Sequence, residues 1–171
     1  PSATCMPAAT RRRGGENRTL PLAAYFLAYG KQDRRPGEFV EAVIVPKIAK
    51  DRVFRIYKLS KRFDQDISAV SAGVSIGVES GKITEARIAF GGMAATPKRA
   101  DACEAALAGQ PWTEATMRTA AEALAQDFQP ISDMRASADY RLRAAKNLLI
   151  KAFIESTAPV RVLAAEAVGH G

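Results

Sequence analysis

The sequence predicts an α+β fold in which an antiparallel sheet of three to four strands is followed by three helices packed on one of its faces. Two observations carry this prediction. Residues 53–90 alternate apolar and small or polar side chains, as half-buried strands do, and after Gly91-Gly92 the apolar spacing changes to the three-and-four pattern of helices. Because the strands come first and the helices afterwards, an antiparallel sheet with segregated helices is favoured.

The first 50 residues predict few regular elements. The run from Arg11 to Gly15 is interpreted as a turn or loose arm. A short strand over 18–22, a turn or helical segment over 23–29 and a polar loop over 30–37 follow. Alternation and β-branched content predict a strand over 38–45, which Pro46 ends, and a soft domain boundary is placed at 47–52.

Three strands are expected next, over 53–59, 67–78 and 83–90. In the second of them one face is apolar, whereas the other carries only Ser71, Gly73, Ser75 and Gly77. A strand face made only of glycine and serine implies that something else comes very close to it. Ser80-Gly81 predicts a hairpin turn, after which Ala86, Ile88 and Phe90 share one face.

Three helices are expected over about 97–108, 114–127 and 137–155, and residues 157–171 are expected to form a flexible tail. For the first helix, Thr96 is the predicted N-cap, Pro97 the first helical residue and Gly109 the residue just past the end. The other two carry apolar stripes at helical spacing.

The composition is ordinary for a globular chain of 171 residues, with 47% apolar and 25% charged residues. No apolar run approaches the roughly 20 residues that span a bilayer, so neither a membrane protein nor a membrane partner is expected. No leader follows Pro1, and Cys5 and Cys103 are expected to be reduced, buried thiols of a cytoplasmic protein. His170 is the only histidine, so neither a closed metal site nor a catalytic triad can be assembled.

The charge is distributed unevenly along the chain. Residues 1–62 carry a net charge of +9 and residues 63–171 carry −2, which together give the net charge of +7. A basic first half suggests contact with an anion, such as a phosphate-bearing cofactor, or simply a solvated face. Lys58, at the end of a predicted strand, can reach a phosphate or an electron-rich ring at the rim of the sheet. Gly91-Gly92 is either a weak phosphate-loop signal or a tight reversal, and the second interpretation is favoured.

Several motifs, taken in order, resemble a known family. They are Tyr29-Gly30-Lys31-Gln32, Arg35-Pro36-Gly37-Glu38, the stretch from Tyr57 to Arg62 continuing through Asp66-Ile67, Phe90-Gly91-Gly92-Met93-Ala94, Thr96-Pro97-Lys98-Arg99-Ala100, the stretch from Pro111 to Thr116, and the stretch from Asp127 to Ser137. Over roughly residues 19–156 the series resembles the flavoprotein of the molybdenum hydroxylases, in the family of the CO dehydrogenase flavoprotein C-terminal domain. The last two motifs resemble especially the C-terminal portion of the FAD-binding small subunit of bacterial xanthine dehydrogenases.

The resemblance implies an electron-transfer function. In this family purines are hydroxylated at a molybdenum cofactor on a large subunit, and electrons pass through two [2Fe-2S] clusters to FAD, which reduces NAD. The resemblance gives Lys58 as a residue that contacts FAD, Val40 as an apolar position beside the cofactor, and residues 61–66 as a loop near the flavin. It implies a hetero-oligomer with the molybdenum-binding subunit, and it leaves open whether the substrate is a purine, an aldehyde or CO, with purines favoured.

The chain also departs from the family's pattern. Thr4 stands where the family has an FAD-contacting Asp, Gln65 stands where an acidic residue is common, and the Gly-rich pyrophosphate loops and the [2Fe-2S] domain are not among these residues. Residues 1–50 are therefore expected to be the truncated end of an FAD-binding subdomain and residues 51–156 the α+β C-terminal domain. We expect weak or no FAD binding and no activity from this chain alone.

Two alternatives stay open beside the flavoprotein. One is a flavin-free interaction module that docks to a molybdenum hydroxylase large subunit. The other is a nucleic-acid binder, suggested by Arg11-Arg12-Arg13 and a pI near 9.7. The second is disfavoured because the aromatic residues do not interleave with the basic ones as stacking platforms do, so no nucleic-acid partner is expected.

Overall fold

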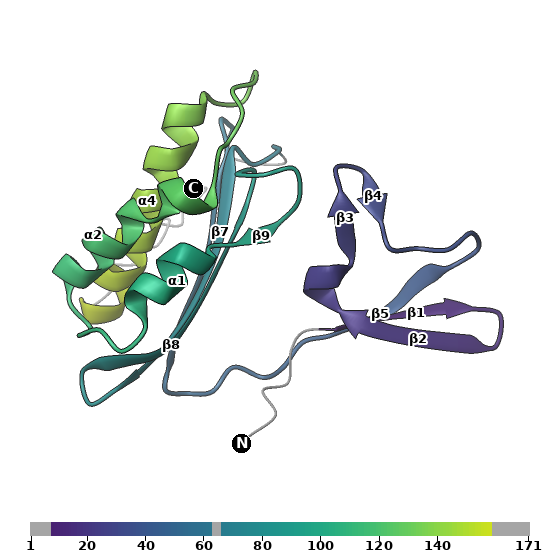
Figure 1. Cartoon of the computed structure of the whole chain (residues 1–171), viewed down its shortest axis with the longest axis horizontal. Coiled ribbons are helices and arrows are strands. Elements are labelled where there is room, and N and C mark those ends of the chain that lie inside the picture. Colours follow the sequence, from purple (N-terminus) through teal and green to yellow (C-terminus); the bar gives the residue numbers. More distant parts are fainter. Residues whose placement is uncertain (1–7, 63–65, 159–171) are drawn as a thin grey trace, which may run out of the picture.

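The computed structural model describes residues 8–62 and 66–158, which form two groups of strands with the helices beside the second group (Figure 1). The N-terminal group contains a three-stranded sheet in the order β2-β1-β5 and a two-stranded sheet of β3 and β4. The bounds of its elements are β1 Ala8–Arg13, β2 Glu16–Pro21, the 3-10 turn η1 Leu22–Ala24, β3 Phe26–Ala28, β4 Lys31–Gln32 and β5 Phe39–Ile44.

The interpretation of Arg11 to Gly15 as a loose arm is wrong. The three arginines belong to β1, and Gly14-Gly15 is the two-residue turn that joins β1 to β2, with Arg13 paired to Glu16. Gly14 has a φ of +58°, a left-handed conformation that glycine adopts without strain. Two of the three arginines pair with carboxylates, since Arg12 lies 2.8 Å from Glu41 of β5 and Arg11 pairs with Asp33.

An ion network holds the loop before β5 against the β1–β2 hairpin. Arg18 donates from Nε and Nη2 to the two carboxylate oxygens of Glu38, each at 2.8 Å, and Nη2 also lies 3.1 Å from Oδ1 of Asp33. Arg11, which is buried, pairs with Asp33 from the other side. The hydrogen bonds from Arg18, followed by that from the Arg35 amide, lower the pKa of Glu38 to about 2. Three arginines of the first half, Arg11, Arg12 and Arg18, are therefore paired with carboxylates of this N-terminal group.

The second group is a four-stranded antiparallel sheet in the order β6-β7-β8-β9, as expected. Its strands are β6 Arg52–Leu59, β7 Val70–Glu79, β8 Lys82–Gly91 and β9 Lys98–Arg99. The predicted apolar face of the second strand is confirmed, since Val70, Ala72, Val74 and Ile76 are buried. A β-bulge between β7 and β8 shifts the register at Gly77 and Val78, so Ile83 lies in the core together with Ile88 and Phe90 despite the odd spacing.

The helices cover one face of this sheet (Figure 1). They are α1 Asp101–Leu107, α2 Glu114–Glu122, α3 Leu124–Asp127 and α4 Ala138–Thr157. The predicted α+β fold with helices on one face is confirmed, with the helix expected over 114–127 divided into α2 and α3 at Ala123. Thr113 and Ser137 cap α2 and α4, respectively, by accepting a hydrogen bond from a backbone N–H.

The predicted start of the first helix is wrong. Thr96 and Pro97 precede β9, and α1 begins at Asp101 after Ala100, whose side chain makes no cap. The cap comes instead from Asp127 at the end of α3, whose carboxylate accepts hydrogen bonds from the N–H groups of Ala102 at 2.8 Å and Cys103 at 3.0 Å. A carboxylate at a helix N-terminus also interacts favourably with the helix dipole.

Cys103 is a buried free thiol on α1, as predicted, and burial raises its pKa to about 12. Cys5, Thr4 and His170 lie outside the described residues, as does most of the expected tail. In the part of the chain that the structure describes, no helix is long and apolar enough to cross a bilayer.

Candidate functional site

The face of the β6–β9 sheet opposite the helices is the candidate site, and it is turned toward the N-terminal strands (Figure 1). We call it the open face and define it by residues that the register places in cross-strand pairs. Lys58 lies opposite Ser71, Ile56 opposite Gly73 and Phe54 opposite Ser75, and Gly73 lies opposite Ala89 of β8. The open face thus has apolar and basic side chains along β6 and a tract of very small residues beside them.

This tract is open at its centre. A Cβ atom added to Gly73 would meet no atom within 4 Å, whereas one added to Gly77 would lie 2.9 Å from Oγ1 of Thr84. The sequence predicted that another group comes close to the glycine and serine face. At Gly77 that group is the side chain of Thr84 in the same sheet. At Gly73 no described protein atom fills the space, which leaves a surface on which a flat group can lie close to the backbone.

The apolar part of the open face is exposed. Ile56 has 71% of its residue surface accessible, and Phe54 has 36%. Both alternate with inward-facing residues of β6, since Val53, Tyr57 and Leu59 pack against the core. Phe54 and Ile56 adjoin on one face of β6, and adjoining exposed apolar side chains are typical of a surface that another molecule covers.

The basic side chains at the two ends of the open face differ in whether they are paired. At one end, Glu85 accepts from Nη1 of Arg52 at 2.5 Å and from Nε of Arg87 at 2.6 Å, so both arginines share one carboxylate. These bonds, that of Arg52 above all, lower the pKa of the Glu85 carboxyl. At the other end, Lys58 is exposed, and within residues 8–62 and 66–158 its ammonium makes no hydrogen bond or ion pair.

The connection from β6 to β7 begins after Leu59, the residue that follows Lys58. Lys61 donates from Nζ to the main-chain oxygen of Met134 at 2.6 Å, and Arg62 pairs with Asp66 at 3.3 Å. The hydrogen bond from Arg62 lowers the pKa of Asp66. Within this loop Arg62 and Asp66 therefore compensate each other's charge, whereas Lys61 contacts a different segment. Asp64 and Gln65 lie outside the described residues.

A buried arginine fixes the surroundings of that connection. Arg141 of α4 is 3% exposed and donates from Nη1 to the oxygens of Ala69 and Gly92, and from Nη2 to Asp133. Gly92 has a φ of +78°, and a Cβ there would lie 2.5 Å from the oxygen of Ala69. The glycine pair is therefore explained by a tight reversal against β7, the interpretation that the sequence favoured. A pocket of about 470 Å³ beside Met134 and Tyr140 lies between these segments.

Val40, the other predicted site residue, lies on β5 of the N-terminal sheet opposite Arg11, and its side chain is 37% exposed. Lys58 and Val40 thus belong to different sheets, and no hydrogen bond or ion pair in the described ranges joins their strands. The assignment of both residues to a cofactor site stays a prediction.

Sequence reasoning missed several residues that shape the open face. The outward direction of Ile56 and Phe54 follows from the alternation in β6 and could have been inferred from it. The pairing of Arg52 and Arg87 with Glu85 could not, because it depends on cross-strand register. Among the described residues, no group of three or more His, Cys, Asp or Glu side chains is placed to hold a metal ion.

Comparison with solved structures gives the class of fold. A chain of carbon monoxide dehydrogenase from Hydrogenophaga pseudoflava, in the form that lacks the Mo-pyranopterin moiety of the molybdenum cofactor, superposes with a TM-score of 0.78 at 27% sequence identity, over 85% of this chain and 50% of that chain. A chain of quinoline 2-oxidoreductase from Pseudomonas putida 86 has the same fold, with a TM-score of 0.77 at 23% identity, over 87% of this chain and 51% of the other.

The family follows from the sequence. Residues 55–156 match the family described as CO dehydrogenase flavoprotein C-terminal domain, and this chain belongs to it. The resemblance inferred from the motifs is thereby confirmed.

The chain is 31% identical over 147 residues to nicotinate hydroxylase hnxS of Emericella nidulans, covering 82% of this chain and 11% of the relative. It is 28% identical over 142 residues to the xanthine dehydrogenase FAD-binding subunit of Escherichia coli O157:H7, covering 82% of this chain and 49% of the relative. The chain thus spans about half the length of that bacterial subunit and a tenth of the fungal enzyme.

Proposed function

We propose that this chain is the C-terminal part of the FAD-carrying subunit of a molybdenum hydroxylase and that its open face borders the flavin. The observation that carries the proposal is the opening at Gly73, flanked by exposed Ile56 on one side and ending at the ammonium of Lys58. A flavin ring is flat and largely apolar but gains negative charge on reduction, so this combination of surfaces fits it.

Each side chain has a separate part in this proposal. Lys58 stabilises negative charge on the reduced ring, which raises the reduction potential, because a cation close to an anion in a partly desolvated site lowers its free energy. Ile56 and Phe54 cover the apolar part of the flavin ring and exclude water from it. Val40 contributes a second apolar contact from the N-terminal sheet, as the family resemblance suggests.

The flavin would accept electrons that arrive from molybdenum and [2Fe-2S] centres elsewhere in the complex and deliver them to NAD. Purine hydroxylation is the favoured overall reaction because the C-terminal motifs resemble xanthine dehydrogenases most, and the bacterial relative with that name is similar over 82% of this chain. These parts of the proposal concern the whole enzyme, with the molybdenum-binding subunit as the main partner.

The exposure of strand β5 is evidence that this chain is part of a larger assembly. All six of its residues are exposed, including Phe39, Val40, Val43 and Ile44, and among the described strands it pairs along one edge, with β1. A strand that is apolar on both faces is typical of the interior of a sheet, not of its margin. We infer that further polypeptide of the flavoprotein, or a partner subunit, covers this strand.

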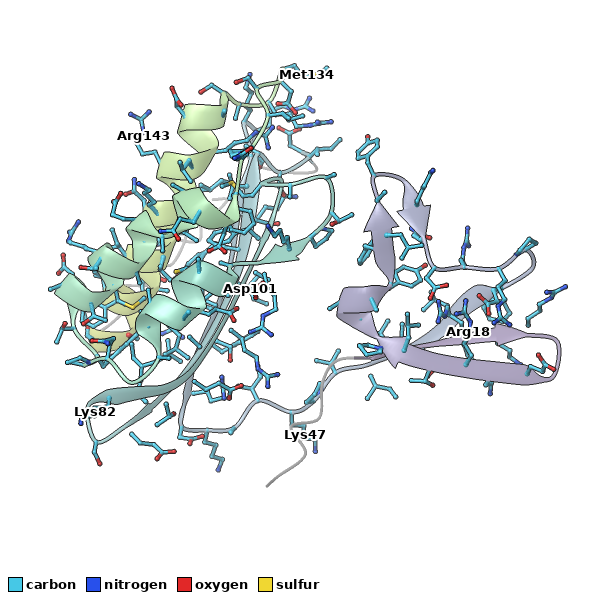
Figure 2. The ribbon with its side chains drawn as sticks, viewed as in Figure 1. Arg18, Lys47, Lys82, Asp101, Met134 and Arg143 are labelled. Atoms are coloured by element: carbon cyan, nitrogen blue, oxygen red, sulfur yellow. The ribbon has the colours of Figure 1, made fainter. Side chains whose placement is uncertain are left out.

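The proposal is tested with the complete flavoprotein that contains this chain. We expect it to purify with the absorbance of bound flavin, and we expect Lys58→Met to raise the dissociation constant of FAD about tenfold and to lower the flavin potential. The control is Lys82→Met, because Lys82 lies at the opposite end of the sheet from Met134 and hence from the Lys58 end (Figure 2).

Two results would contradict the proposal. A complete flavoprotein that carries no flavin yet co-purifies with the molybdenum subunit would establish the interaction module instead. Equal flavin affinity and potential in Lys58→Met and Lys82→Met would remove the open face from the cofactor site.

A further inference from the structure

We propose that Glu155, in the last turn of α4, is a positioning residue that holds the edge strand β6 through Tyr57 and so keeps the Lys58 ammonium in place on the open face. The inference rests on the function proposed above and adds to it a residue that lies on the other side of the sheet from the cofactor site. It is carried by the weak support of β6 on its outer face and by the contacts of Glu155 on its inner face.

The outer face of β6 is held at its beginning, where Arg52 pairs with Glu85 of β8, and has little to hold it beyond that point. In the four-stranded sheet β6 is an edge strand with β7 as its neighbour. The residues opposite Phe54, Ile56 and Lys58 are Ser75, Gly73 and Ser71, which offer almost no side-chain surface for cross-strand packing. Because cross-strand side-chain pairs stabilise strand pairing, the small tract that leaves room for a ligand also leaves β6 weakly held on that face.

The inner face provides the compensating contacts. Tyr57 donates its hydroxyl hydrogen to Oε2 of Glu155 at 2.6 Å, and Nη2 of Arg55 donates to the main-chain oxygen of the same glutamate at 3.1 Å. Glu155 therefore accepts from two alternate residues of β6, one with its side chain and one with its backbone. The 100 residues between Arg55 and Glu155 make this a long-range link between the edge strand and the last helix.

Lys151 completes the cluster from within α4. Its ammonium donates to the Glu155 carboxylate and lies 5.8 Å from the centre of the Tyr57 ring. Lys151, with Tyr57, lowers the pKa of Glu155, while burial and the Glu155 carboxylate raise the pKa of Tyr57. At neutral pH a neutral phenol thus donates to a carboxylate, the charge-assisted arrangement that makes a stronger hydrogen bond than two neutral groups.

Tyr57 and Lys58 are consecutive, so their side chains leave the strand on opposite faces. Fixing the Tyr57 ring among the helices therefore fixes the backbone from which Lys58 extends. Without the Tyr57 hydroxyl, β6 keeps its ladder to β7 and its apolar contacts, but it opens locally more often. The Lys58 ammonium then spends less time in the position that contacts the flavin.

The first arm of the test measures the strand itself, in the chain without cofactor. We expect Tyr57→Phe to accelerate hydrogen exchange of the β6 amides bonded to β7 roughly fivefold, because one hydrogen bond that opposes local opening is lost. Glu155→Ala should do the same, and Glu155→Gln, which keeps an acceptor, should restore most of the protection. Glu122→Gln is the matched control, since it breaks an exposed pair with Lys146 on the helical layer. Unchanged exchange in Tyr57→Phe would overturn the inference.

The second arm is a double-mutant cycle on FAD affinity in the complete flavoprotein. Tyr57→Phe alone should raise the dissociation constant about threefold, and it should have no further effect when Lys58 is already replaced by methionine. A merely structural role predicts the same loss in both backgrounds, and that result would overturn the inference while leaving the proposed function intact. If Lys58→Met alone has no effect, the proposed site fails and the inference fails with it.

Discussion

Arg141 donates a hydrogen bond from Nη2 to Oδ1 of Asp133, eight residues before it, at 2.6 Å. The same guanidinium binds the main-chain oxygens of Ala69, just before β7, and Gly92, just after β8. One buried side chain thus joins α4, the loop that precedes it and two strands of the sheet. The Asp133 carboxyl is held ionised by the N–H groups of Arg135 and Ala136 together with Arg141, which lower its pKa to about 2.

Replacing Arg141 should cost more stability than any exposed substitution on the same helix. Arg141→Met keeps most of the apolar stem but leaves the buried carbonyl oxygen of Ala69 and the Asp133 carboxylate without this donor, so we expect a loss of about 3 kcal/mol in the free energy of unfolding. Urea denaturation monitored by Trp112 fluorescence measures it. Arg143→Met is the control because Arg143 points away from the core (Figure 2), and its effect should stay below about 0.5 kcal/mol. Equal midpoints for the two variants would show that the Arg141 contacts add nothing to stability.

Gly92→Ala should destabilise the chain more than Gly109→Ala, although both glycines have a φ above +70°. At Gly109 an added methyl group meets nothing within 4 Å, so the cost is the left-handed backbone alone, about 1–2 kcal/mol. At Gly92 the methyl also meets the oxygen of Ala69 and displaces Arg141, and we expect about 2 kcal/mol more. Thermal unfolding of the two variants side by side checks the difference, and similar losses would exclude the close approach seen here.

Removal of the Asp127 carboxylate should loosen α1. Asp127→Ala leaves the N–H groups of Ala102 and Cys103 without their acceptor, at a cost of about 1 kcal/mol, as for other helix caps. The change also reduces the protection of the buried Cys103 thiol, so its alkylation, measured by mass spectrometry on the Cys103 peptide, should become faster. Gln126→Ala, at the exposed neighbouring position, should leave the alkylation rate unchanged. Slow alkylation in both variants would contradict the cap.

Glu38 should make the N-terminal sheet sensitive to acid. Its pKa is lowered from 4.5 to about 2 by Arg18, so its contribution to stability is complete above pH 4.5 and is lost as the pH falls from about 4.5 toward 2. Protection of the β2 and β5 amides from hydrogen exchange should therefore fall in this range more steeply in the parent chain than in Glu38→Gln. The exposed Glu79→Gln should keep the parent profile, and a Glu38→Gln variant with that same profile would contradict the role of the network.

Local periodicity was enough to predict the main body of the fold. The buried run from Val70 to Ile76 and the apolar stripe of α4 each follow from side-chain spacing, and so does the outward direction of Lys58. Contacts between distant segments could not be read in this way. Thr96 and Pro97 were the local signal for the start of the first helix. The cap is instead the carboxylate of Asp127, 25 residues further along the chain, which accepts from the Ala102 N–H.

The arginine run was misread for a related reason. A run of basic residues with two glycines has the composition of a loop, and its strand character appears only when Glu41 and Asp33 are known to lie within reach. The candidate site shows the same division. Alternation identifies which side chains leave β6 on the open face, whereas the empty space over Gly73 and the anchoring of Tyr57 depend on the placement of β7 and α4.

The β-bulge opposite Gly77 has a consequence for how the hairpin forms. With Thr84 and Glu85 sharing one position of the ladder, the apolar residues on either side of the bulge reach the same face only in a single alignment of β7 and β8. Sliding one strand by a residue would send Arg87 into the apolar interior, and sliding it by two would separate the extra residue from Gly77. During folding, β7 and β8 therefore form the native hairpin in one register alone. Insertions should be tolerated at the Ser80-Gly81 turn but not between Ile83 and Ala86.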